Sequence, residues 1–157
     1  KWENIKYDFK HINLHMIGKL QTNKVKIAVS LFDYIHSLDS LRLAEKISNE
    51  QLKQNKKLKI LIQVNIGEEN QKNGISISEV GNFYKKCIEN FDLNIVGFMC
   101  LPPNNENVSL YFSKMQTLVN DVGLGELSMG MSNDYLEAIK FKSTYLRIGS
   151  KIFGSRS

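Results

Sequence analysis

The sequence predicts an α/β protein built around a parallel sheet, and three observations support this. Short apolar, β-branched runs alternate along the chain with segments in which apolar residues recur every three or four positions. The apolar runs are nearly continuous, as in strands that are covered on both faces. No linker or low-complexity stretch interrupts the alternation, so we expect residues 1–157 to form a single domain.

Six segments fit buried strands. They are LHMIG (14–18), YIHSL (34–38), KILIQVNI (59–66), NIVGFMCL (94–101), GELSMG (125–130) and TYLRIGS (144–150). This spacing gives roughly 25 residues per strand-and-helix unit, which suits either a doubly wound sheet or part of a TIM barrel, whose eight units usually take about 250 residues. Periodicity does not distinguish the two folds.

The segments between these strands predict amphipathic helices. The clearest are 39–53, 78–91, 107–122 and 132–141, and a weaker helical pattern covers 21–32. Candidate N-caps are Asp39 or Ser40 for the first, Ser78 for the second and Ser132 for the fourth. In the helix over 132–141, Leu136 and Ile139 are the expected core residues, with Tyr135 as a further candidate.

Composition limits the class of protein. The 157 residues are 42% hydrophobic, enough for a core, and no apolar run approaches the roughly 20 residues of a membrane span. The first residues, KWENIKYDFKH, have neither a signal-peptide apolar region nor an initiator Met, so we expect a natural start elsewhere. The low cysteine content leads us to expect a cytoplasmic protein. Cys87 and Cys100 lack metal-site spacing and are expected to be reduced core residues. A net charge of +5 comes from scattered lysines, which favours a solvated surface over nucleic-acid binding.

A phosphate site is predicted where the fifth and sixth strands end. Ligands bind beyond the carboxyl ends of parallel strands, and there the chain reads GMS (130–132) and RIGS (147–150). In each motif a glycine permits close backbone approach and a serine adds a donor. Either motif alone is an ordinary cap or turn, but the two together, with Arg147 between them, favour phosphate.

Arg147 lies between Leu146 and Ile148, so its guanidinium needs a partner inside the protein. That partner is either an acidic residue on a neighbouring strand or a ligand, and the sequence leaves both open. His15 and His36 also fall in predicted strands, where a histidine is more often a core residue than a catalyst. The sequence contains no nucleophile elbow, P-loop or dinucleotide-binding motif.

Several blocks resemble one known family. HMIGKLQTNK (15–24), IHSLDSLRLAEKI (35–47), LIQVNIGEENQKNGI (61–75), GFMCLPP (97–103), LSMGMSNDYLEAI (127–139) and YLRIGSKIFG (145–154) follow the order seen in the pyridoxal-phosphate homeostasis protein family (YggS type, proline synthetase co-transcribed homologue). The resemblance implies a TIM-type (β/α) barrel like the alanine racemase N-terminal domain. It also implies a non-catalytic role in holding pyridoxal 5'-phosphate (PLP) and delivering it to PLP-dependent apoenzymes.

The resemblance also assigns site residues. Arg147 would lie beside the pyridine nitrogen of PLP, and His15 would line the barrel beneath the cofactor. Lys72, in a loop at the same end of the barrel, could attract the phosphate. The residues expected to hold the phosphate, with Met131 beside them, are Ser132, Gly149 and Ser150.

The family pattern begins with two further strands, and these are absent here. The first carries the lysine that forms the Schiff base with PLP, so this anchor is expected upstream of residue 1. We therefore expect 1–157 to be the C-terminal three-quarters of a PLP-binding barrel, about six of eight βα units. The intact protein is expected to be a monomer that contacts neither nucleic acid nor membrane.

Two alternative functions remain. A PLP-dependent amino-acid racemase or decarboxylase of the same barrel type would use a similar site, although a racemase needs a second base facing the lysine. A phosphate-binding TIM-barrel enzyme without PLP would need only the two serine-containing turns.

Overall fold

The structure, a computed structural model, describes residues 2–9, 11–103 and 107–154. Its centre is one curved sheet of six parallel strands that follow chain order. The strands are β1 (His15–Met16), β2 (Tyr34–Leu38), β3 (Lys59–Val64), β4 (Ile95–Cys100), β5 (Glu126–Met131) and β6 (Tyr145–Arg147). The helices are α1 (Trp2–Asp8), α2 (Val25–Leu31), α3 (Leu41–Gln54), α4 (Val80–Glu89), α5 (Val108–Asp121), α6 (Tyr135–Lys140) and α7 (Ser150–Phe153), with short 3-10 turns at Thr22–Lys24 and Ile77–Glu79.

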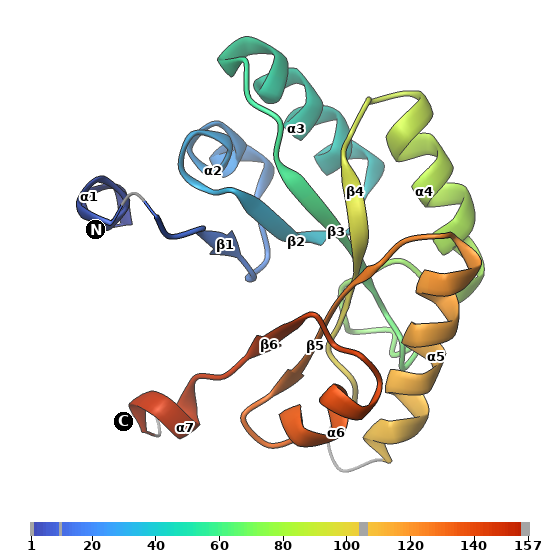
Figure 1. The fold of residues 1–157 in the computed structure, drawn as a ribbon. Coiled ribbons are helices and arrows are strands. Elements are labelled where there is room, and N and C mark those ends of the chain that lie inside the picture. The colour runs from blue at the N-terminus through green and yellow to red at the C-terminus, as the bar shows by residue number, and fades with distance from the viewer. Residues whose placement is uncertain (1, 10, 104–106, 155–157) are drawn as a thin grey trace.

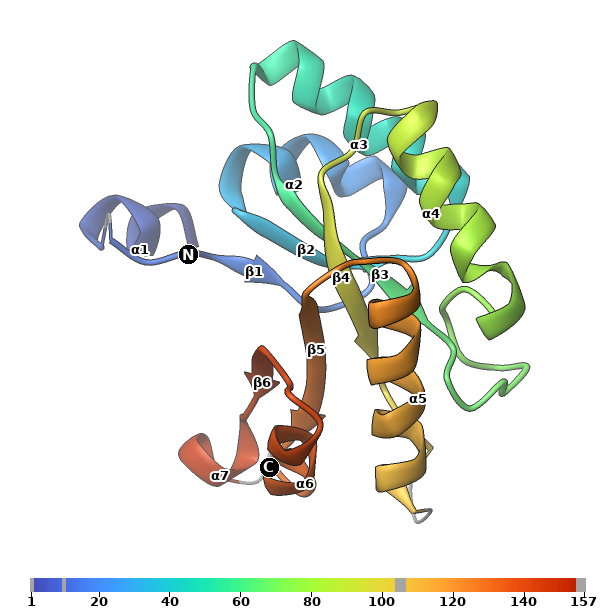
Figure 2. The ribbon, with the colours of Figure 1, turned by 45° about the vertical axis from the view of Figure 1, so that its right-hand side comes forward.

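Strand order decides between the two predicted architectures. A doubly wound sheet reverses its direction of growth, whereas here each strand adds to the same side of the one before it. Helices α2 to α5 cover the convex face, and the edge strands β1 and β6 lie on the same side of the molecule (Figures 1 and 2). The described chain is an incomplete TIM-type barrel.

The outer face of the sheet forms the main hydrophobic core with the helices. Ile35, Ile62, Phe98 and Phe112 are almost fully buried there. Cys87 and Cys100 are buried free thiols, as predicted, and burial raises the pKa of each to about 12. Both cysteines therefore act as small core residues.

All six predicted strands are present in the structure, whereas some of the predicted helices differ from the observed ones in their caps, first residues and buried residues. Ser40 caps α3, as expected, by accepting the Leu43 N–H at 3.3 Å. Ser78 does not cap α4, because a 3-10 turn precedes that helix. The prediction for 132–141 was wrong in two respects, since the helix begins only at Tyr135 and its short length buries Ala138 instead of Leu136 and Ile139.

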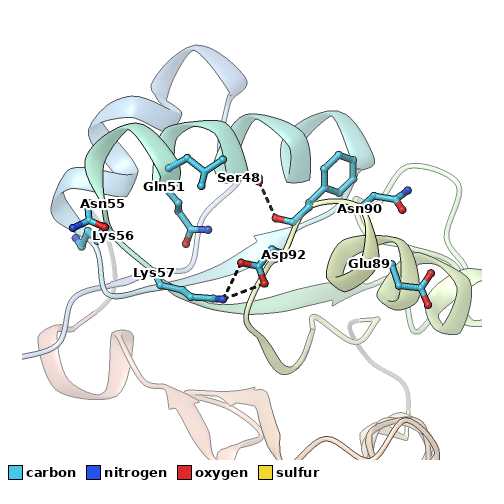
Figure 3. A pocket seen from close by; sticks show the side chains of 10 residues that line it. Ser48, Gln51, Asn55, Lys56, Lys57, Glu89, Asn90 and Asp92 are labelled. Atoms are coloured by element: carbon cyan, nitrogen blue, oxygen red, sulfur yellow. Dashed lines mark hydrogen bonds and ion pairs between the residues drawn. The ribbon is translucent and has the colours of Figure 1, made fainter.

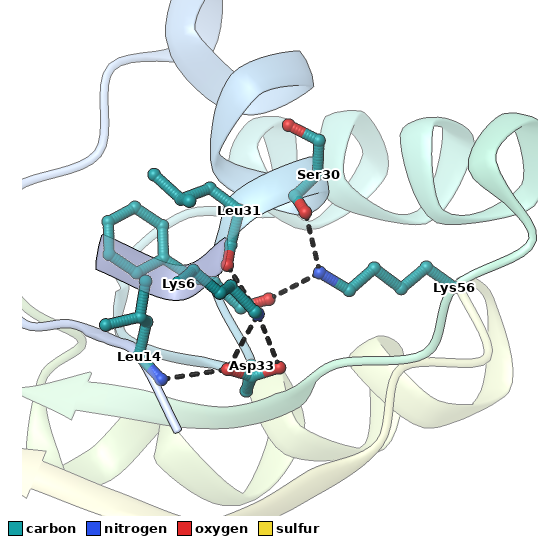
Figure 4. A network of polar contacts seen from close by, with 7 residues as sticks. Lys6, Leu14, Ser30, Leu31, Asp33 and Lys56 are labelled. Atoms are coloured by element: carbon teal, nitrogen blue, oxygen red, sulfur yellow. Dashed lines mark hydrogen bonds and ion pairs between the residues drawn. The ribbon is translucent and has the colours of Figure 1, made fainter. Parts of the chain in front are cut away.

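A hydrogen-bonded cluster of Lys6, Asp33 and Lys56, the polar clasp, attaches α1 to the amino-terminal side of the sheet (Figure 4). The Lys6 ammonium donates to both carboxylate oxygens of Asp33, at 2.8 and 2.9 Å, and to the Leu31 carbonyl at 2.7 Å. Asp33 also accepts the N–H of Leu14, and Lys56 donates to the carbonyls of Ser30 and Phe32. The clasp satisfies carbonyls at the end of α2 and sets the position of β1.

The concave face of the sheet differs from the convex face because it carries aromatic and polar side chains. His15 stacks on Tyr34, with ring centroids 4.0 Å apart, and Tyr145 approaches both rings. The Tyr145 hydroxyl donates to Glu126 at 2.8 Å. His36, only 1% exposed, lies among these rings, and burial together with the neighbouring His15 and Arg147 lowers its pKa to about 3.

The close packing of β4 against β5 leads to a first prediction, about stability. A Cβ atom on Gly97 would lie 1.8 Å from the Glu126 carbonyl oxygen, so the two strands would have to separate. We expect Gly97→Ala to lower the free energy of unfolding by roughly 2 to 3 kcal/mol in urea denaturation. Gly81→Ala, in α4, is the matched control, because a Cβ there meets nothing within 4 Å. This substitution should raise the free energy of unfolding by roughly 0.5 to 1 kcal/mol, because alanine favours the helix more than glycine does. Equal effects of the two substitutions would contradict this account.

The burial of the His36 ring leads to a second prediction, about how stability depends on pH. Its pKa falls from 6.5 to about 3 on folding, so below about pH 6.5 the unfolded chain binds a proton that the folded chain does not. Stability is therefore fully present above that pH and should fall by roughly 2 kcal/mol between about pH 7 and about pH 5. Urea denaturation of His36→Gln should show a flatter pH profile. His11→Gln, which alters an exposed histidine, should keep the wild-type profile.

Candidate functional site

A pocket of about 380 Å³ opens at the carboxyl ends of β5 and β6. It brings together five of the residues singled out from the sequence. They are Met131, Ser132, Arg147, Gly149 and Ser150, joined in the lining by Asn133 and Asp134. His15 is not among the lining residues.

An irregularity in β5 shapes this pocket. Ser128 pairs with Tyr145 and Met131 with Arg147, so the register shifts between these two pairs. Gly130 lies in the shifted segment with φ of 93°, and a Cβ there would come within 2.6 Å of the Ala138 side chain. Only glycine fits both the backbone angle and the contact. The shift brings the end of β5 beside the turn that follows β6.

Ser132 joins the two strand ends. Its side-chain oxygen accepts the backbone N–H of Gly149 at 3.2 Å and that of Lys151 at 3.4 Å. The prediction that Ser132 caps α6 is therefore wrong, and Asp134 holds the N-cap position. The Asp134 carboxylate accepts the Met131 N–H at 2.5 Å. The Ser132 oxygen and two backbone N–H groups thus meet at the edge of the pocket, and the assignment of these groups to phosphate stays a prediction.

Arg147 has neutral partners. Its Nη1 donates to the Ser128 hydroxyl at 2.7 Å, and its Nη2 donates to the Cys100 carbonyl at 2.8 Å. The ion pairs found in the described part of the chain all involve lysines, so the structural ion pair considered for Arg147 is not observed. Burial lowers the pKa of the guanidinium, while Cys100 and Asp134 oppose that shift. A partly desolvated cation without a bonded carboxylate favours an electron-rich ligand.

The two strand histidines are connected to Arg147. The His36 ring contacts the Ser128 hydroxyl through Nδ1 and His15 Nδ1 through Nε2, both at 2.9 Å. His36 is a buried strand residue, as expected, but it also belongs to the surroundings of the site. Sequence reasoning missed Ser128, whose one visible signal is a hydroxyl inside the apolar run GELSMG.

Three lysines near the carboxyl ends of the strands have partners in the structure. Lys72 pairs with Glu69 at 2.5 Å, and Lys19 donates to Asn73 at 2.6 Å. Lys151 lies over the Tyr135 ring, 4.8 Å from its centroid. Within the described ranges, no group of three or more His, Cys, Asp or Glu side chains is placed to bind a metal. No described helix has the length and apolar character needed to cross a membrane.

A larger pocket, of about 430 Å³, lies between the carboxyl ends of α3 and α4 (Figure 3). Lys57 and Asp92 form an ion pair in it at 3.1 Å, and Ser48 donates to the Phe91 carbonyl. Because α3 and α4 end before β3 and β4 begin, this pocket faces the amino-terminal side of the sheet. Ligand sites of parallel barrels form on the opposite side, so the smaller pocket is the candidate site.

Comparison with known proteins agrees with this fold. The family model of the alanine racemase N-terminal domain matches residues 10–157. Two curated relatives, both named pyridoxal phosphate homeostasis protein, come from Aquifex aeolicus (38% identity over 151 residues) and Haemophilus influenzae (36% over 170 residues). The chain aligns over 90% and 99% of its own length with these proteins and covers 66% and 71% of theirs.

Solved structures lead to the same family. PipY of Synechococcus elongatus, solved without PLP and with PLP bound, superposes with TM-scores of 0.87 and 0.86 at 27% identity. The alignments cover 98% and 97% of this chain and 77% and 75% of the PipY chains. The chain spans about two thirds of the length of the Aquifex relative. Sequence and structure together place the chain in the pyridoxal phosphate homeostasis protein family, with the fold of the alanine racemase N-terminal domain.

Proposed function

We propose that this chain supplies the phosphate-binding part of a protein that holds PLP and delivers it to PLP-dependent apoenzymes without turning over a substrate. The names of the relatives and the PLP-bound form of PipY support PLP as the ligand. The observation that carries the proposal is the pocket at the ends of β5 and β6, which Ser132, Gly149 and Ser150 line together with Arg147, a partly buried cation with neutral partners. Residues 1–157 would be the C-terminal three-quarters of the binding barrel.

The phosphate group fits the donors at the ends of β5 and β6. We assign it to the Ser132 hydroxyl, the backbone at Gly149 and the Ser150 hydroxyl, with Met131 alongside. A phosphate oxygen would take over the N–H groups that Ser132 now accepts. Gly149 leaves open space, because a Cβ there meets nothing within 4 Å. Asp134 lies in the same lining and disfavours an anion that approaches from its side.

In this proposal Arg147 faces the pyridine nitrogen of the cofactor, and His15 lines the barrel beneath it. PLP acts as an electron sink most effectively when that nitrogen is protonated. A guanidinium beside the nitrogen opposes its protonation, because two positive charges would then be adjacent. Ser128 and Cys100 keep the guanidinium in place, and the site therefore suits holding the cofactor better than activating a substrate.

The third prediction concerns PLP binding by the chain as given. We expect weak, reversible binding in an absorbance titration, and no lysine modified after borohydride treatment, as read by intact mass. Ser132→Ala should weaken binding roughly tenfold, because the phosphate loses a donor. Ser30→Ala, on the exposed surface of α2, should bind as wild type does. A lysine of this chain reduced onto PLP, or equal affinity of Ser132→Ala and wild type, would contradict the assignment.

The fourth prediction separates cofactor holding from catalysis. The protein saturated with PLP should neither racemise nor decarboxylate amino acids above the rate of free PLP, because the guanidinium keeps the ring a poor electron sink. Chiral chromatography and carbon dioxide release measure the two reactions. Clear turnover would favour a racemase or decarboxylase. Competition by inorganic phosphate without any PLP-specific absorbance would instead favour a phosphate-binding enzyme.

A further inference from the structure

A continuous series of hydrogen bonds crosses the concave face of the sheet from Arg147 to His15. Arg147 Nη1 lies 2.7 Å from Ser128 Oγ, Ser128 Oγ lies 2.9 Å from His36 Nδ1, and His36 Nε2 lies 2.9 Å from His15 Nδ1. The series begins on β6 and ends on β1, the two edge strands of the sheet. Only three hydrogen bonds separate Arg147 from His15, so a change at Arg147 can alter which nitrogen of His15 is protonated.

Arg147 sets the direction of these hydrogen bonds. A guanidinium can only donate, so Ser128 Oγ accepts from it. Ser128 is 0% exposed, and His36 Nδ1 is its other side-chain contact among the described residues. The serine hydroxyl must therefore donate to His36 Nδ1, since a buried hydroxyl proton without an acceptor carries a desolvation cost. His36 Nδ1 is consequently an acceptor.

The tautomers of both histidines follow from this direction. A neutral imidazole that accepts at Nδ1 carries its proton on Nε2, so His36 Nε2 donates to His15 Nδ1. His15 Nδ1 then accepts as well, which leaves the His15 proton on Nε2. Burial favours the neutral form of both rings, because it lowers the pKa of each. The opposite tautomers would leave the Ser128 proton unpaired.

We infer that Ser128 is a positioning residue that fixes the Arg147 guanidinium and, through His36, holds His15 as a neutral donor at Nε2. His15 thereby carries an N–H group on β1, at the opposite edge of the sheet from the cation on β6. The link to PLP rests on the proposed function, whereas the direction of the hydrogen bonds depends only on the four side chains. Any ligand that changes how strongly Arg147 donates to Ser128 changes the tautomer balance at His15.

The test is nitrogen-15 NMR of histidine-labelled protein without PLP, which distinguishes protonated from unprotonated ring nitrogens. In the wild type we expect a protonated Nε2 and an unprotonated Nδ1 on both His15 and His36. Ser128→Ala and Arg147→Met should each produce mixed tautomers on both rings. In the alanine variant Nδ1 of His36 loses its donor, and in the methionine variant the serine is free to accept from His36.

Ser132→Ala is the matched control, because it removes a buried serine hydroxyl from the same region without touching the series. It should keep both wild-type tautomers. A proton on Nδ1 of His36 in the wild type, or wild-type tautomers in Ser128→Ala, would overturn the inference. The wild-type spectrum decides the direction even if a variant folds poorly.

A PLP titration distinguishes this inference from the proposed function. Ser128→Ala should weaken PLP binding roughly threefold to tenfold, because Arg147 loses one of its two fixed acceptors. Ser128→Thr, which keeps the hydroxyl, should restore both the tautomers and the affinity. If the wild type shows the expected tautomers but does not bind PLP, the proposed function fails and the positioning role stands. If PLP binds equally well to Ser128→Ala, the role assigned to Ser128 fails alone.

Discussion

Arg147 places a guanidinium inside a curved sheet, where the described residues offer it a hydroxyl and a carbonyl as partners. A cation in such surroundings is stable only if its donors are satisfied and some solvent or ligand remains within reach. The carbonyl of Cys100 comes from β4 and the hydroxyl of Ser128 from β5, the strand beside β6, so both β4 and β5 must end at the correct height. The arrangement of β4, β5 and β6 therefore determines the site.

Close backbone packing supplies that arrangement. Gly97 lets β4 approach β5 without a side chain between them, and Gly130 lets β5 shift its register beside β6. The shift turns Ser132 toward the backbone of Gly149, where its oxygen accepts two N–H groups. Two glycines thus place the polar groups of the site, although neither glycine contacts a ligand in the proposed arrangement.

The two faces of the sheet have different roles. The convex face buries aliphatic and aromatic side chains under α2 to α5 and supplies most of the hydrophobic stabilisation. The concave face holds His15, Tyr34, His36 and Tyr145, whose rings pack at the centre of the curve. Polar groups there cost stability unless they bond to one another, and the series from Arg147 to His15 meets that need.

The sequence by itself determined the class of fold, the six strands and the turns that form the pocket, because these depend on local patterns of apolar residues, glycine and serine. It also singled out Arg147 as the side chain in greatest need of a partner. Only the tertiary structure decided which partners it has, that Ser132 bonds to the turn after β6 instead of capping α6, and that His36 meets Ser128 across 92 residues of sequence. Alternation along a strand indicates which face a side chain occupies, whereas its contacts across the sheet depend on the curvature and register of several strands together.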